Sequence, residues 1–144
     1  MSILDDPIDP GPGWQRDHLV RYVETGGQEG HIWMGVPTLL LTVHDAPTGR
    51  ATRTPLIYGR DGDRYLVVAS AGGAPEHPMW YSRLADEPDV RVQVLDDVFN
   101  ARAETAAGAE RERLWQVMTG IWPAYDEYQT KTDRQIPVVT LTRA

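Results

Sequence analysis

The stretch that decides the fold is TLLLTVHDAPTGRATRTPLIYG, residues 38–59. Its first seven residues are mostly aliphatic or β-branched, a composition that predicts a strand. The tetrapeptide Ala46-Pro47-Thr48-Gly49 has turn composition, and residues 52–59 predict the strand that returns. Pro55 lies inside this second strand. Because proline has no N–H to donate to a ladder, we expect it at a sheet edge, a bulge or a strand break.

Outward from this hairpin, the chain predicts further hairpins and few helices. Asp61-Gly62 is a dipeptide typical of tight hairpin turns. Further strands are predicted at residues 64–70, 90–95, 98–104 and 136–142, and helices at residues 14–24, 79–85, 110–121 and 124–130. About six strands joined mostly by hairpins predict a mainly β, α+β fold. In it an antiparallel sheet closes into a barrel with the helices packed outside.

The helix at residues 110–121 has the clearest amphipathic pattern. Its predicted apolar face consists of Leu114, Trp115, Val117, Met118 and Ile121. We expect the opposite face to carry Glu110, Arg111, Glu112 and Arg113. This pattern is typical of a helix that covers one face of a sheet.

Composition limits the class of protein. The chain has 144 residues, enough for one domain. Its net charge is −7, so there is no basic surplus to release phosphate counterions, and we expect no nucleic-acid partner. It has no cysteine, which excludes disulfides, cysteine-ligated metals and thiol nucleophiles. The apolar run near residues 36–43 is far shorter than the roughly 18 residues of a membrane-spanning helix, so we expect a cytoplasmic protein.

The first 13 residues differ from the rest of the chain. They carry three prolines, two glycines and three aspartates, a composition that resists folding. We therefore expect a flexible N-terminal tail over residues 1–13 and a single domain over residues 14–144.

Several catalytic motifs are absent from the sequence. There is no P-loop, no dinucleotide-binding glycine fingerprint and no nucleophile elbow. The four histidines, His18, His31, His44 and His77, have no i,i+4 spacing typical of a metal site on a helix, and we expect no metal. An enzyme with this sequence would take its chemistry from a bound cofactor.

The first candidate binding cluster is at residues 50–58. Arg50 and Arg53 flank hydroxyl side chains at a strand start, a pattern that suits a phosphate or carboxylate. The same residues also suit a charged hairpin edge that resists aggregation.

The second cluster, residues 69–81, runs from a buried strand through small residues to a helix start. Small residues allow backbone N–H groups to approach a ligand, and a helix N-terminus favours negative charge. A plain connecting loop is the alternative.

The third cluster is aromatic. Trp122, Tyr125 and Tyr128 recur every three residues and so share a helix face, with Trp115 nearby in sequence. Such a face packs in a core or covers a planar ligand. The polar residues around the two tyrosines favour the wall of a pocket.

Taken in order, these segments resemble the deazaflavin-dependent nitroreductase family, whose members use coenzyme F-420. The resemblance extends from about residue 38 to residue 142. The motifs that carry it are LLLT at 39–42, TPLIYGRDG at 54–62, VAS at 68–70 with Gly72-Gly73, HPMWY at 77–81, PxYxxYQ at 123–129, TDR at 132–134 and IPV at 136–138.

The resemblance implies a split β-barrel of the FMN-binding type that holds a deazaflavin in a groove. Its implied activity is hydride transfer from reduced coenzyme F-420 to a small conjugated acceptor, such as a nitroaromatic, a quinone or an enone. Ser70, Tyr125 and Tyr128 would polarise the acceptor, with Trp122 and Ile57 as pocket wall. The implied cofactor-binding residues are Ala46, Pro47, Thr48, Arg50, Thr52, Arg53, Thr54, Pro55, Leu56, Ile57, Val68, Ala69, Ser70, Ala71, Gly72, Met79, Trp80, Tyr81, Ser82, Arg83 and Tyr125.

The chain departs from the family at three positions. Ala46, Thr52 and Ala71 stand where the family often has basic residues that would hold the anionic tail of the cofactor. Arg50 and Arg53 are near enough to replace them, but strand alternation puts the two on opposite faces, so only one can. The alternatives are a barrel that binds FMN, heme or another planar anion, and a deazaflavin-binding module without catalysis. Both a monomer and a homodimer are compatible with the sequence.

Overall fold

The structure is a computed structural model that describes residues 2–144. The helices are α1 (Trp14–Thr25), α2 (Met79–Asp86), α3 (Gly108–Ile121) and α4 (Ala124–Thr130), with 3-10 turns η1 (Ile3–Asp5) and η2 (Ala71–Gly73). The strands are β1 (Pro7–Ile8), β2 (Ile32–Trp33), β3 (Val36–Asp45), β4 (Arg50–Ile57), β5 (Gly59–Asp61), β6 (Arg64–Val68), β7 (Asp89–Val94), β8 (Asp97–Thr105) and β9 (Val138–Arg143). No helix of residues 2–144 has the length and apolar character needed to cross a membrane.

The described strands form one nine-stranded sheet that is not closed. Their order is β1-β4-β3-β7-β8-β9-β6-β5, with β2 paired to β3 beside this path. Every ladder is antiparallel except the parallel pair β1–β4. The predicted α+β class with a mostly antiparallel sheet is therefore confirmed. The predictions of about six strands and of a fully closed barrel are wrong.

The additional strands are too short to leave a periodic pattern in the sequence. β1 and β2 have two residues each, and β1 exists only through its pairing with Ala51 and Thr52 of β4. The segment expected to be a flexible tail thus contains both η1 and β1. The predicted strand at residues 52–59 is divided at Tyr58, whose backbone N–H still donates to the Pro37 carbonyl of β3 at 3.1 Å, whereas β5 beyond it pairs with β6.

Pro55 lies at an edge of the sheet, as predicted. Its inner neighbour is Leu40 of β3, while β1 covers only Ala51 and Thr52 on the outer side of β4. The second half of β4 therefore has a free edge, where the missing N–H of proline breaks no ladder bond.

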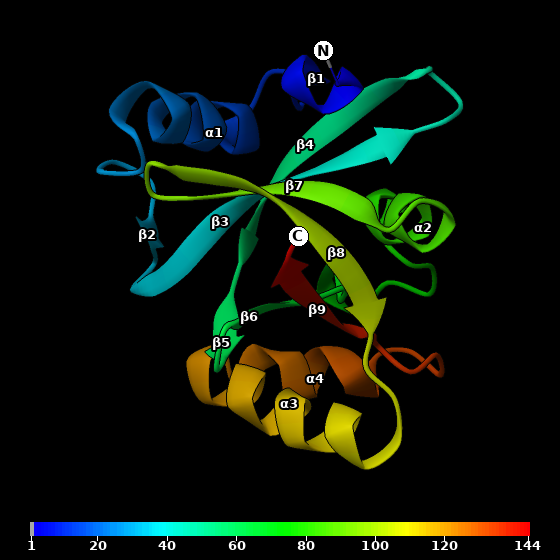
Figure 1. Cartoon of the computed structure of the whole chain (residues 1–144). Helices are drawn as coiled ribbons and strands as arrows, with labels where there is room; N and C mark the ends of the chain where they lie inside the picture. Colours follow the sequence, from blue (N-terminus) through cyan, green and yellow to red (C-terminus); the bar gives the residue numbers. More distant parts are fainter. Residues whose placement is uncertain (1) are drawn as a thin grey trace.

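Two clusters of buried residues form most of the core. The larger one lies inside the sheet around Leu39, Val67 and Leu141 and is closed by Trp80 and Leu84 of α2. The smaller one packs α3 and α4 against β6 and β9. Figure 1 shows α3 and α4 together at the β5–β6 end of the sheet and α1 on the far side of β3.

The inner face of α3 is made largely as predicted, by Leu114, Trp115 and Met118. Arg111 differs from the expectation, because its side chain is buried and not on the opposite face. Its guanidinium lies 4.5 Å from the Trp115 ring centre and donates to the Ile136 carbonyl at 2.6 Å. A long aliphatic stem allows an arginine to pack like an apolar residue while its charged end finds a carbonyl.

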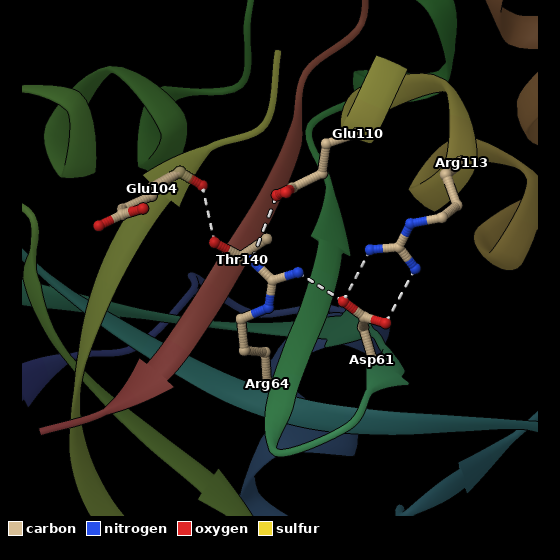
Figure 2. A network of polar contacts seen from close by, with 6 residues as sticks. All are labelled: Asp61, Arg64, Glu104, Glu110, Arg113 and Thr140. Atoms are coloured by element: carbon tan, nitrogen blue, oxygen red, sulfur yellow. Dashed lines mark hydrogen bonds and ion pairs between the residues drawn. The ribbon is translucent and has the colours of Figure 1, made fainter. Parts of the chain in front are cut away.

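An ion-pair network fastens α3 to the β5–β6 hairpin (Figure 2). Asp61 of the hairpin accepts two hydrogen bonds from Arg113, at 3.0 and 3.1 Å, and a further one from Arg64. Arg64 also donates to Glu110 at 3.2 Å. Arg113 and Arg64 hold the pKa of the Asp61 carboxyl well below its usual range, so the pair with α3 persists in mild acid.

Candidate functional site

A cleft of about 440 Å³ lies between β4, the loop after β6 and the last two helices. Ser70, Tyr125, Tyr128, Trp122 and Ile57, the residues expected to polarise the acceptor or form the pocket wall, all line this cleft. Seven more residues expected to bind cofactor line it too: Thr54, Pro55, Leu56, Val68, Ala71, Gly72 and Trp80.

One wall of the cleft is the outer half of β4. Residues 54–57 are available because β1 covers only the start of this strand. Facing them is Val68, at the end of β6, although β4 and β6 lie near opposite ends of the sheet order. The sheet therefore curls until its two ends enclose the cleft.

The floor of the cleft is the turn η2, which has an unusual backbone. Ala71 has φ 47° and Gly72 has φ 65°, so an alanine occupies the left-handed region that favours glycine. The amides of Ala71 and Gly72 donate to no protein group of residues 2–144. Gly73 follows with φ 87°, and a Cβ there would lie 2.6 Å from the Tyr128 carbonyl oxygen. Only glycine allows this turn to pack so closely on α4.

Tyrosines from α4 form the aromatic wall. The Tyr125 ring is 5% exposed and packs at 6.2 Å from Trp115 and 6.1 Å from Tyr128. Burial, and secondly Tyr128, raise the pKa of the Tyr125 hydroxyl well above its ordinary value of 10.0, so it keeps its proton. The Tyr128 hydroxyl accepts a long 3.5 Å hydrogen bond from the Trp122 indole.

Three residues that line the cleft, Thr54, Ser70 and Tyr125, have hydroxyls with no hydrogen-bond partner within residues 2–144. Tyr125 and Ser70 are the two that the sequence predicted to polarise an acceptor, and neither hydroxyl is sealed from the cleft. Buried tyrosine hydroxyls usually find a partner. These two groups are therefore placed to donate to a ligand.

Sequence reasoning missed six lining residues, most of them from the N-terminal third: Trp14, Gln15, His18, Trp33, Thr38 and Pro78. Trp14 stacks on Trp33 with ring centres 5.6 Å apart, and Trp33 lies 5.9 Å from Trp122. These three tryptophans close one side of the cleft. No local sequence signal marks these residues, and the structure leaves Trp14 60% exposed on α1.

Other expected cofactor residues lie outside this cleft. Ala46 and Arg83 line a separate cavity, where Arg83 donates to the buried carboxylate of Asp45 at 2.7 Å. Thr52, Arg53 and Met79 line a neighbouring cavity of about 310 Å³. It borders the cleft, since Gln15, Thr54 and Trp80 line both. The expected residues that line neither of these cavities nor the cleft are Pro47, Thr48, Arg50, Ala69, Tyr81 and Ser82.

Both arginines expected to hold an anionic tail are engaged with the N-terminal segment. Arg53 makes a bidentate pair with Asp9, at 2.8 and 2.9 Å, with each side chain 20% exposed. Arg50 pairs with Asp6 at 3.3 Å in a far more exposed position. Because both arginines are already paired with aspartates, an anion would have to displace a carboxylate to bind either of them.

The fold and the cleft define a class: an α+β protein with a cleft whose aromatic walls suit a flat conjugated ligand. Within that class, a family model described as F420H(2)-dependent quinone reductase matches residues 14–143, and the chain belongs to this family. It is therefore an F420-dependent reductase, and its cofactor is coenzyme F-420. The resemblance found in the sequence motifs is confirmed.

Named relatives agree with this assignment. An F420H(2)-dependent quinone reductase of Mycobacterium tuberculosis is 42% identical over 132 residues, which cover 89% of each chain. A solved structure described as an F420-H2 dependent reductase is 40% identical with a TM-score of 0.68, covering 73% of this chain and 93% of its own. Another, described as a domain-swapped dimer, is 37% identical with a TM-score of 0.71, covering 88% and 95%.

Proposed function

We propose that the cleft holds the ring of coenzyme F-420 beside a quinone, and that the chain catalyses hydride transfer between them. The observation that carries this proposal is the pair of hydroxyls, Ser70 and Tyr125, that face an apolar cleft without a protein partner in residues 2–144. A quinone carbonyl oxygen is an acceptor of the kind these donors lack.

The residues present fit the cofactor. Pro55, Leu56 and Ile57 provide a flat apolar surface for the ring, with Val68 opposite. Successive amides in a left-handed turn form a nest for anions, and the amides of Ala71 and Gly72 are such a pair, which suits the cofactor phosphate. Ala71 itself stands where the family often has a basic side chain, so we propose that backbone donors bind the phosphate here.

Reduced coenzyme F-420 supplies the hydride when it is bound. The chain's own residues position the acceptor and exclude water. The Tyr125 hydroxyl keeps its proton because of its raised pKa, and its hydrogen bond strengthens as negative charge develops on the acceptor oxygen. Trp122, Trp33 and Trp14 cover one side of the cleft and limit access of water.

We also propose that nitroaromatics and enones are accepted. Both present a conjugated π-system with an oxygen that gains charge during reduction, so the same donors serve. A nitroaromatic differs from a quinone in the bulk around this oxygen. Because Tyr128 packs beside Tyr125, we expect these two residues to determine the preference between the two substrates.

The test measures turnover of reduced coenzyme F-420 with a benzoquinone, a naphthoquinone and a nitroaromatic. Tyr125→Phe removes one hydrogen bond in the transition state and should lower kcat about tenfold. Tyr65→Phe is the matched control, because Tyr65 packs against Phe99 outside the cleft. Unchanged turnover in Tyr125→Phe, Tyr128→Phe and Trp122→Ala would contradict the proposed site.

We infer further that the fold is a split barrel and that the chain forms a homodimer. The curled sheet, whose strands β4 and β6 meet across the cleft, supports the first inference. The solved relative described as a domain-swapped dimer supports the second. Light scattering coupled to size exclusion measures the mass, and a value of about 16.1 kDa would contradict the dimer.

A further inference from the structure

The motif TDR at residues 132–134 has no part in the cleft described above, yet its arginine is bonded to the loop that forms the cleft floor. Arg134 donates to the Ser70 carbonyl at 2.8 Å, to the Ala69 carbonyl at 3.2 Å and to the Ala74 carbonyl at 3.0 Å. It also donates to Nδ1 of His77 at 3.0 Å. One guanidinium thus binds four acceptors spread over residues 69–77, more than 55 residues away in sequence.

This loop needs an external support. Ala71 is in the left-handed region, which is unfavourable for a residue with a side chain. Such a conformation persists only where the surroundings over-determine it. A guanidinium is a rigid planar fork, so three carbonyls bound to it have fixed relative positions. Arg134 therefore determines where Ser70 and the amides of Ala71 and Gly72 lie.

The charge of Arg134 is also available to the cleft. Its partners are carbonyls and an imidazole nitrogen, and no carboxylate of residues 2–144 lies within ion-pair distance. By contrast, Arg53 and Arg50 are neutralised by Asp9 and Asp6. A positive charge directly behind an anion-binding turn raises the potential at that turn.

We propose that Arg134 is a positioning residue for the cofactor: it holds the loop of residues 69–74 in its ligand-binding shape and supplies the positive charge behind it. This inference rests on the proposed binding of coenzyme F-420 in the cleft. Arg134 touches neither the cofactor nor the acceptor in this role. Its main effect is therefore on cofactor binding, and it reaches the acceptor only indirectly, through the position of Ser70.

The test is a fluorescence titration of the apo protein with oxidised coenzyme F-420, made for the wild type, Arg134→Gln and Arg134→Lys. We expect the Kd to rise at least tenfold in Arg134→Gln. Arg134→Lys keeps the charge and loses the fork, so its Kd should rise by a smaller factor, a partial rescue. Turnover should show a raised KM for reduced coenzyme F-420 and a smaller change in the KM for the quinone.

The matched control is Arg64→Gln. Arg64 also ties two elements together, through Asp61 and Glu110, but none of the three lines the cleft (Figure 2). Its variant should lose thermal stability and keep the wild-type Kd. If Arg134→Gln and Arg134→Lys also lose only stability, the residue is structural and the inference is overturned. If Arg134→Gln does not fold, Arg134→Lys decides by the same criterion.

Failure of the underlying proposal gives a different result. Ser70→Ala removes a hydroxyl from the floor of the cleft, and Tyr125→Phe removes one from its wall. If the wild type binds coenzyme F-420 while Arg134, Ser70 and Tyr125 variants all leave Kd and turnover unchanged, the cofactor binds elsewhere. If only the Arg134 variants behave as wild type, the cleft assignment stands and the positioning role is wrong.

Discussion

Replacing Asp9 by asparagine should make the protein bind coenzyme F-420 more tightly. The two carboxylate oxygens of Asp9 accept from Nε and Nη2 on one edge of the Arg53 guanidinium, at 2.8 and 2.9 Å, in a cavity that borders the cleft. An anionic cofactor tail that reaches this arginine must first displace the carboxylate. Asp9→Asn keeps the shape of the side chain and removes its charge, so the competition weakens.

The magnitude follows from the geometry of the pair. Exposed ion pairs contribute about 0.2–1 kcal/mol, and hydrogen bonds to charged groups in buried positions about 1.5–3 kcal/mol. The Asp9–Arg53 pair is bidentate but 20% exposed on each side, which places it between these classes. Asparagine retains part of the hydrogen bonding. We therefore expect a gain of about 1 kcal/mol, or roughly a fivefold lower Kd at low salt.

The assay measures cofactor affinity, which should increase in Asp9→Asn, and stability to urea, which should decrease. Fluorescence titration should show the lower Kd, with a gain that shrinks as salt is added. Urea unfolding should show a less stable protein, because the same pair fastens the N-terminal segment to β4. Asp6→Asn is the control, since its pair with Arg50 has side chains that are 84% and 49% exposed. We expect it to change neither quantity measurably.

One result would refute this reasoning. If Asp9→Asn lowers stability and leaves Kd equal to that of Asp6→Asn, the cofactor tail does not use Arg53. The double variant with Arg53→Gln locates the effect further. It should abolish the gain, because the cation for which Asp9 competes is then absent.

Three further predictions concern the wall, the floor and the core. The rate of quinone reduction should not fall around pH 10, because the raised pKa of Tyr125 keeps its hydroxyl protonated above that pH. A profile of rate against pH from 7 to 10.5 checks this. Gly73→Ala should lower the free energy of unfolding by about 2–4 kcal/mol in urea titrations, since it adds a 2.6 Å clash to left-handed strain. The control Gly62→Ala, at φ 61° with open space around a Cβ, should lower it by only about 1 kcal/mol. Leu66→Ala, at a fully buried position, should lower the free energy of unfolding by about 2–5 kcal/mol. Its control Val98→Ala, at a 53% exposed position, should change that free energy by no more than about 0.5 kcal/mol in the same urea titrations.

Much of the fold could be predicted because its signals are local. The strand at residues 38–44 and the helix at residues 110–121 appear at nearly the predicted places, as β3 and α3. Their hydrophobic periodicities are written in consecutive residues. The burial of Arg111 could not be predicted this way, because its partner is the Ile136 carbonyl, far along the chain.

The candidate site was predicted in part for the same reason. Residues 54–57, 68–72 and 122–128 form contiguous motifs, and the structure brings all three segments to one cleft. Trp14 and Trp33 carry no such motif. They enter the site because α1 and β2 pack beside Trp122, a contact between segments some 90 residues apart.

The sequence by itself determined the α+β class, the order of most elements and the family resemblance, because these depend on local patterning and ordered motifs. Only the tertiary structure decided that the sheet stays open, that Arg53 is paired with Asp9, and that Arg134 supports the loop before the cleft. Each of these features depends on how groups distant in sequence are placed relative to one another. Such relative positions depend on how whole elements pack, and no short stretch of residues records them.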